Sequence, residues 1–212
     1  MKQQSFEMVG VFPTPVCIVK RNPELDSIEK KEIENIIEEG MYKNEGNSTS
    51  NNTYIFNNND NLKNLKQFCE QQLKIYVKEV LDPKEELDFY ITQAWINVTK
   101  PGGFHHDHYH PNSCISGVFY VATVEDDKIT FTDPNHKIKQ KIEMEVEEFN
   151  MWNSPTWFFE ANNSELILFP SWLEHRVMPN KEATTDRISI SFNTFVRGSF
   201  GGQMALTELI LK

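Results

Sequence analysis

The N-terminal part of the chain carries two segments in which apolar residues recur at a spacing of three and four. The first covers residues 23–40, with Asn22 suited to the N-cap, Pro23 to the first helical position and Gly40 to the stop. The second covers residues 62–80 and ends before an Asp-Pro pair. Because this spacing places apolar side chains on one face of an α-helix, the sequence predicts two N-terminal amphipathic helices.

A stretch rich in Asn, Ser and Thr separates the two predicted helices. It covers residues 44–61 and is interrupted by a short apolar run at Tyr54, Ile55 and Phe56. This composition is typical of a long surface loop, which is either a lid or a disordered insertion. We expect such a loop here, with at most one strand in it.

The spacing of apolar residues changes after the second helix. Short runs rich in β-branched and aromatic residues, separated by turn clusters, then continue almost to the end of the chain, and residues 9–20 form a similar run at its start. Such runs predict strands, and their number suits a jelly roll, a barrel or a sandwich. The later runs are FYITQAWINV (89–98), CISGVFYVATV (114–124), KITFTD (128–133), KIKQKIEMEV (137–146), ELILFP (165–170) and RISISFNTFV (187–196).

Length and charge exclude several classes of protein. The 212 residues, 39% of them hydrophobic, are enough for one sizeable core. A net charge of -10 is unsuited to binding nucleic acid or anionic lipid. No apolar run approaches the ~20 residues that span a bilayer, and no secretion signal is evident, so we expect a cytoplasmic protein. Cys17, Cys69 and Cys114 are expected to be buried thiols.

Four of the six histidines lie between His105 and His110, just after a Pro-Gly-Gly turn. Imidazole is a common ligand of divalent iron, zinc, copper and nickel. Residues two apart on a strand point to the same side, so His108 and His110 can close on one ion. The alternative is a solvated loop that happens to be rich in histidine, because such tracts are only a compositional hint of metal binding.

Candidate partners of this cluster lie further along the chain. His175 follows an apolar strand and a turn, where loops reach a pocket. Twelve residues later, Arg187 and Ser189 share one face of a predicted strand, and their guanidinium and hydroxyl groups suit a planar carboxylate. Tyr120 could add a phenolic hydroxyl. Taken singly, each is as well explained by an ordinary surface or core position.

The order of these motifs resembles that of the Fe(II)/2-oxoglutarate oxygenases. That family has H-x-D/E, a distal histidine and an arginine beyond it, and this chain has HYHPNSCISGVFYV, LFPSWLEHRVMPN and RISISFN. Over about residues 90–200 it most resembles oxygenases of marine bacteria and their phages in the prolyl-hydroxylase-like branch. The resemblance implies a double-stranded β-helix (jelly-roll, cupin-like) core and an enzyme that uses Fe(II), 2-oxoglutarate and dioxygen.

The resemblance also implies roles for individual residues. Two histidines would bind iron, a third histidine would take the ligand position usually held by Asp or Glu, and a further set would hold the distal carboxylate of 2-oxoglutarate. Asn97 is a weaker candidate for lining the co-substrate pocket. The implied ligands are His108, His110 and His175, and the implied co-substrate residues are Arg187, Ser189 and Tyr120.

The third ligand departs from the family pattern, and an alternative exists. His105 and Asp107 also form H-x-D and would restore the usual two-histidine, one-carboxylate triad. We prefer His108 and His110, because His110-Pro111 leads directly into the loop before the Tyr120 strand. Three neutral imidazoles would leave both charges of Fe(II) to the dianionic co-substrate.

We therefore expect a single oxygenase domain over residues 1–212. Residues 1–85 would form the N-terminal strand, two helices and loop, and residues 86–200 the jelly-roll core. The reaction would couple oxidative decarboxylation of 2-oxoglutarate to succinate with hydroxylation of a peptide or protein side chain, or of a free metabolite. Two alternatives remain: a three-histidine cupin-type iron dioxygenase that does not use 2-oxoglutarate, and a non-catalytic metal-binding jelly roll. The C-terminal stretch either caps the sheet or joins a homodimer.

Overall fold

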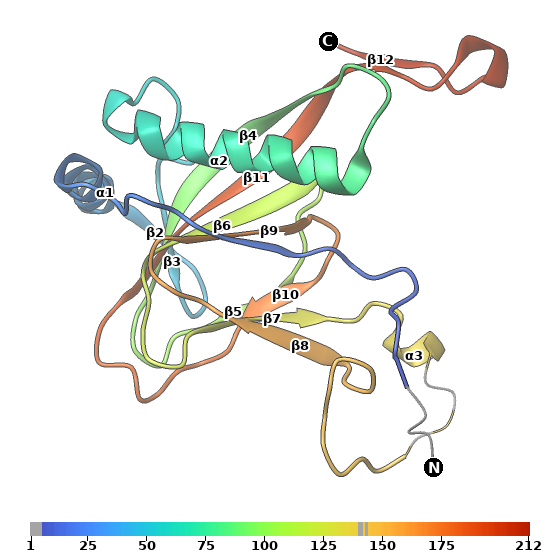
Figure 1. The fold of residues 1–212 in the computed structure, drawn as a ribbon. Coiled ribbons are helices and arrows are strands. Elements are labelled where there is room, and N and C mark those ends of the chain that lie inside the picture. Colours follow the sequence, from blue (N-terminus) through green and yellow to red (C-terminus); the bar gives the residue numbers. More distant parts are fainter. Residues whose placement is uncertain (1–5, 140–141, 143) are drawn as a thin grey trace.

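The protein is built from two antiparallel β-sheets, with two long helices packed against the larger one (Figure 1). The structure is a computed structural model that describes residues 6–139, 142 and 144–212. The larger sheet has the order β1 (Cys17–Lys20), β9 (Glu165–Pro170), β6 (Ile115–Ala122), β11 (Arg187–Phe200), β4 (Asp88–Thr99), β3 (Ser48–Ser50) and β2 (Met41–Lys43). The smaller sheet has the order β5 (His105–His108), β10 (His175–Val177), β7 (Lys128–Thr132) and β8 (Thr156–Glu160).

From β4 to β11 the chain crosses from one sheet to the other after each strand, except that β7 and β8 are consecutive strands of the smaller sheet. β4, β6, β9 and β11 belong to the larger sheet, while β5, β7, β8 and β10 belong to the smaller one. All the strand pairs of both sheets are antiparallel. This alternation is the winding of a double-stranded β-helix, so the predicted fold class is confirmed.

The helices α1 (Ser27–Glu39) and α2 (Lys63–Tyr76) cover the outer face of the larger sheet (Figure 1). A 3₁₀ turn, Asp60–Leu62, leads into α2, and a π-helical turn, Val77–Leu81, ends it. Leu65, Leu73 and the Cys69 thiol of α2 are buried in the same core as residues of β4 and β11. All three cysteines are free thiols. Cys69 is buried as expected, whereas Cys17 and Cys114 are only half-buried.

The first helix begins later than the Asn22-Pro23 pair predicts. Asp26 is the N-cap, and its carboxylate accepts hydrogen bonds from the backbone N–H groups of Ile28 and Glu29 at 2.8 Å. The Glu29 carboxylate in turn accepts from the Asp26 N–H at 3.0 Å. This reciprocal capping box satisfies two otherwise unpaired N–H groups, which fixes the helix start at this position. The predicted stop at Gly40 is confirmed.

The Asn-rich stretch, residues 44–61, is a structured surface segment that contains one short strand, β3. Two of its apolar residues, Ile55 and Phe56, are buried in the helix-covered core. The backbone of Ile55 also pairs with Ala94 of β4 at 3.1 Å. Buried side chains and backbone hydrogen bonds therefore hold this segment on the sheet, so it is ordered.

The prediction of a strand over residues 137–146 is wrong for the part of that segment that the structure describes. His136–Lys139 forms the short helix α3, and the described residues after it have no strand partner. Residues 140, 141 and 143 lie outside the described residues. The described residues of this alternating run of lysines, glutamates and apolar residues have no neighbouring strand to pair with, and alternation alone does not make a strand without one.

The C-terminal residues extend the end of β11 as a hairpin. β12 (Leu209–Leu211) pairs with Gly198, Ser199 and Phe200, and the 3₁₀ turn Gln203–Ala205 joins the two strands. The hairpin projects beyond the larger sheet (Figure 1). Within the described ranges, no helix is long and apolar enough to span a bilayer.

Close packing at Gly117 of β6 gives a prediction about stability. A Cβ atom at this position would overlap the buried ring of Phe192 on the neighbouring strand β11. We expect Gly117→Ala to lower the free energy of unfolding by about 1–3 kcal/mol, the usual cost of overpacking a core. Gly202→Ala is the matched control, because its added Cβ would meet nothing nearer than 3.9 Å. Denaturant unfolding of both variants checks this, and equal stability of the two would contradict the packing argument.

Candidate active site

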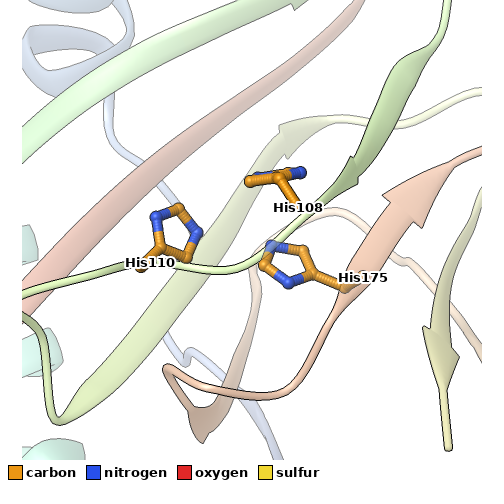
Figure 2. Close-up of side chains that lie close together, drawn as sticks. All are labelled: His108, His110 and His175. Carbon is orange, nitrogen blue, oxygen red and sulfur yellow. The ribbon is translucent and has the colours of Figure 1, made fainter. Parts of the chain in front are cut away.

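Three histidines from the smaller sheet and the loop after β5 lie close together with their rings turned toward one another (Figure 2). His108 ends β5, His175 begins β10, and the two are paired directly across the strands. His110 follows two residues after His108, and its backbone N–H donates to the Ser171 carbonyl at 2.9 Å. One nitrogen from each ring lies within 4.8 Å of the others. The spacing and convergence suit three ligands of a single metal ion.

Hydrogen bonds and burial leave these rings ready to donate lone pairs. The Nδ1 atoms of His108 and His175 lie 2.8 and 3.0 Å from the carbonyls of His106 and Leu173. A carbonyl only accepts, so each Nδ1 carries the proton and each Nε2 carries a lone pair. Metal-ligating histidines are commonly oriented by such a second hydrogen bond.

Burial also keeps the three imidazoles neutral. Desolvation, followed by the neighbouring His108, lowers the pKa of His175 to about 2 and that of His110 to about 4. Desolvation likewise lowers the pKa of His108, against the opposing effect of its hydrogen bond to the His106 carbonyl. Neutral imidazole is the form that binds a metal, so no proton has to be displaced at neutral pH.

The alternative ligand pair, His105 and Asp107, is arranged differently. Both carboxylate oxygens of Asp107 accept from Nη1 of Arg176 at 3.0 Å. The His105 ring stacks on that of His108 with 4.2 Å between centroids, and burial lowers its pKa to about 3. Asp107 is therefore held by a cation, whereas the nitrogens of His108, His110 and His175 face one another.

The predicted carboxylate anchor lies on the larger sheet. Arg187 begins β11 and is 6% exposed, and its Nη1 donates to the Ser189 hydroxyl at 3.5 Å. Its guanidinium lies 5.1 Å from the centre of the Tyr120 ring. Tyr120 and Asn97 are the direct neighbours of Ser189 on β6 and β4. The register thus brings together four residues that are far apart in sequence.

Two of these side chains differ in how their polar atoms are used. The Tyr120 hydroxyl is fully buried and has no hydrogen-bond partner among the described residues. Burial raises its pKa, so the hydroxyl stays protonated and can donate. The Asn97 amide instead donates to the Ser191 hydroxyl at 2.9 Å and accepts from Thr49 at 3.1 Å. Tyr120 is therefore free to bind a ligand, while Asn97 is engaged within the sheet.

The sequence did not single out a further residue, Asp127, that contacts Arg187. Nε of Arg187 donates to both carboxylate oxygens of Asp127 at 2.9 Å, and both side chains are almost fully buried. Burial raises the pKa of Asp127, and the adjacent guanidinium opposes that shift. Asp127 occupies the turn before β7 in a run of acidic residues, where nothing in the sequence separates it from an ordinary exposed turn residue.

A cavity of about 530 Å³ adjoins this ion pair. Arg187, Asp127 and Thr99 line it, together with residues of the loop between β10 and β11. The three converging histidines are not among the residues that line it. The cavity therefore lies beside the Arg187–Asp127 ion pair and does not mark the position of the histidine cluster.

Comparisons with known proteins agree with this arrangement. Residues 93–193 match a protein family described as "Putative 2OG-Fe(II) oxygenase". No curated protein matches the sequence.

Several solved structures share the fold. A prolyl-4-hydroxylase from Pseudomonas putida is 14% identical, with a TM-score of 0.58 over 87% of this chain and 94% of that one. A Trichoplax adhaerens prolyl hydroxylase, solved with a fragment of the hypoxia inducible factor oxygen degradation domain, is 13% identical, with a TM-score of 0.57 over 85% and 83%. HygX from Streptomyces hygroscopicus, with nickel, 2-oxoglutarate and hygromycin B bound, is 10% identical, with a TM-score of 0.53 over 85% and 82%.

The fold and the matched family define a non-haem oxidoreductase. Residues 93–193 match the 2OG-Fe(II) oxygenase family, whose members use Fe(II), 2-oxoglutarate and dioxygen. The expected family is thereby confirmed, while the marine bacterial and phage relatives stay a prediction.

The residues present fit this cofactor and co-substrate. Three neutral imidazoles with nitrogens within 4.8 Å supply the donor set for a divalent ion. The buried, unpartnered Tyr120 hydroxyl and the Arg187 guanidinium supply donors for a carboxylate. An unsatisfied buried hydroxyl is costly, and a ligand oxygen would satisfy it.

Proposed function

We propose that His108, His110 and His175 bind Fe(II), and that Arg187, Ser189 and Tyr120 bind the distal carboxylate of 2-oxoglutarate. The observation that carries the proposal is the convergence of the three histidine nitrogens within 4.8 Å. The Arg176–Asp107 ion pair supports it further, because that carboxylate would have to leave its partner to serve as a ligand.

Each proposed residue has a distinct task. Burial keeps the imidazoles neutral, and the carbonyls of His106 and Leu173 orient two of them. Arg187 would offer parallel N–H groups to the carboxylate, and Tyr120 would add an O–H. Fe(II) held by the three histidines would supply the chemistry by which oxidative decarboxylation of 2-oxoglutarate to succinate is coupled to hydroxylation of the substrate.

Because the three ligands carry no charge, the Fe(II) site would keep two positive charges. A dianionic co-substrate would balance them, whereas a carboxylate ligand would already have cancelled one. The three-histidine set therefore favours an anionic keto acid as the species that completes the metal site.

We propose a peptide or protein side chain as the substrate class. Support comes from the fold shared with two prolyl hydroxylases, one of them solved with a peptide fragment. HygX, which shares the fold with hygromycin B bound, shows that small molecules are also bound by this architecture. Shared fold is an analogy, so the site itself has to be tested with peptides.

The test is anaerobic addition of Fe(II) and 2-oxoglutarate to the purified protein. We expect a weak visible charge-transfer band between the metal and the chelated keto acid, and succinate after oxygen is admitted. Zn(II) in place of Fe(II) is the control, because it should bind without giving the band. Iron binding without the band would contradict the use of 2-oxoglutarate.

A further inference from the structure

We infer that Asp127 is a positioning residue that fixes the Arg187 guanidinium so that only its terminal edge receives the co-substrate carboxylate. The inference rests on the proposed function, since it concerns the same anchor. It assigns a role to a residue from the turn before β7, which lies on the opposite sheet from Arg187.

Asp127 occupies one edge of the Arg187 guanidinium. A guanidinium can bind a carboxylate along its side edge, through Nε and one terminal nitrogen, or along its end edge, through both terminal nitrogens. Both Asp127 oxygens accept from Nε of Arg187 at 2.9 Å, so the side edge is occupied. Of the terminal N–H groups, one contacts Ser189 at 3.5 Å, and the Tyr120 side chain also interacts with this guanidinium.

Two hydroxyl-bearing residues lie beside the terminal edge of the guanidinium. Ser189 lies on this edge, and the Tyr120 ring lies 5.1 Å from the guanidinium carbon with its hydroxyl unpartnered. A carboxylate docked here would meet two guanidinium N–H groups and be able to reach both hydroxyls. Docked along the side edge it would displace Asp127 and leave a buried carboxylate without a partner, which is costly.

Burial of the Arg187–Asp127 ion pair fixes the orientation of the guanidinium. The side chains of Arg187 and Asp127 are 7% and 2% exposed, so water cannot readily replace either partner. A charged pair held out of water is strongly orienting, whereas the same pair at the surface would be loose. Without Asp127, the guanidinium would be free to turn its terminal edge away from Ser189.

The inference is tested by comparing two keto acids in anaerobic charge-transfer titrations with Fe(II). 2-Oxobutyrate has the same chelating groups as 2-oxoglutarate but no distal carboxylate. We expect Asp127→Ala to weaken 2-oxoglutarate binding about tenfold, the loss of one well-formed charged hydrogen bond, and to leave 2-oxobutyrate binding within about twofold. We expect Asp127→Asn, which keeps an acceptor for Nε, to weaken it only about threefold.

Asp126→Ala is the matched control. Asp126 is the preceding residue, its side chain is 84% exposed, and its contact with Lys128 is at 3.9 Å. We expect it to bind both keto acids like the wild type. Thermal unfolding verifies that each variant is folded, and Asp127→Asn carries the test if Asp127→Ala is not.

The titrations distinguish failure of the Asp127 role from failure of the proposed function. Unchanged or tighter 2-oxoglutarate binding in both Asp127 variants would overturn the positioning role while leaving the proposed function intact. Equal weakening of both keto acids would also overturn it, because the damage would then not pass through the distal carboxylate. No band in the wild type with either keto acid would overturn the proposed function and this inference together.

Discussion

Arg187→Met should weaken 2-oxoglutarate binding at least ~100-fold, because it removes the charged hydrogen bonds to the distal carboxylate, each worth about 1.5–3 kcal/mol. Arg187→Lys should rescue little of this loss, since an ammonium keeps the charge but lacks the planar fork. The measurement is the charge-transfer titration with Fe(II), in which the half-saturating 2-oxoglutarate concentration is read directly. Arg197→Met is the control, because Arg197 is exposed and stacks on Tyr90 at the far end of β11.

Loss of Arg187 also leaves the Asp127 carboxylate buried without its partner, which costs about 3–5 kcal/mol of stability. The double variant Arg187→Met/Asp127→Asn removes that charge and separates loss of binding from loss of folding. We expect it to be more stable than Arg187→Met alone and still to bind 2-oxoglutarate as weakly. Binding close to that of the wild type in the double variant would contradict the assignment of the anchor.

Removal of His175 should strongly weaken binding of the metal. We expect His175→Ala to weaken Fe(II) binding by more than ~100-fold, since loss of even an outer-shell partner of a metal ligand costs about 10–100-fold. His175 is buried against Phe131 and Phe169 and is paired with His108, so its truncation removes one of the three converging nitrogens from the centre of the cluster. Competition with a chromophoric chelator under anaerobic conditions measures the affinity.

Two further variants decide which residues complete the ligand set. Asp107→Asn should keep Fe(II) affinity within a few-fold of the wild type, because its carboxylate is held by Arg176. His110→Ala should lose affinity to an extent comparable with His175→Ala. The opposite pattern, loss with Asp107→Asn and retention with His110→Ala, would assign the site to the His105 and Asp107 pair.

The parts of the fold that follow from local spacing could be predicted. The apolar positions of α2 recur at three and four, and Leu65, Cys69 and Leu73 are buried as that spacing requires. Alternation in β11 likewise separates Ile190 from its neighbours Ser189 and Ser191. The start of α1 was misplaced because Pro23 is a strong local signal, and the Asp26–Glu29 capping box outweighs it through two reciprocal hydrogen bonds.

Contacts between distant segments could not be predicted. Nothing near Asp127 in the sequence indicates a buried partner sixty residues away, and nothing near Asp107 indicates Arg176. The Asp127–Arg187 pair depends on how the two sheets face each other, and the Asp107–Arg176 pair depends on the pairing of β5 with β10. The histidines were easier to find, because His108 and His110 are close in sequence and only His175 is distant. The candidate metal ligands could therefore be predicted from residue type and spacing. The ion pairs that orient neighbouring side chains became visible only in the folded structure.

The two faces of β11 tie correct folding to the candidate site. Ile190 and Phe192 point into the helix-covered core, while Arg187 and Ser189 lie on the opposite face. A shift of one residue in the pairing of this strand would exchange the faces, placing a guanidinium under the helices and an isoleucine beside Asp127 and Tyr120. A misregistered chain would thus be both unstable and inactive. Selection for a stable core therefore also maintains the strand register that places Arg187 and Ser189 in the candidate site.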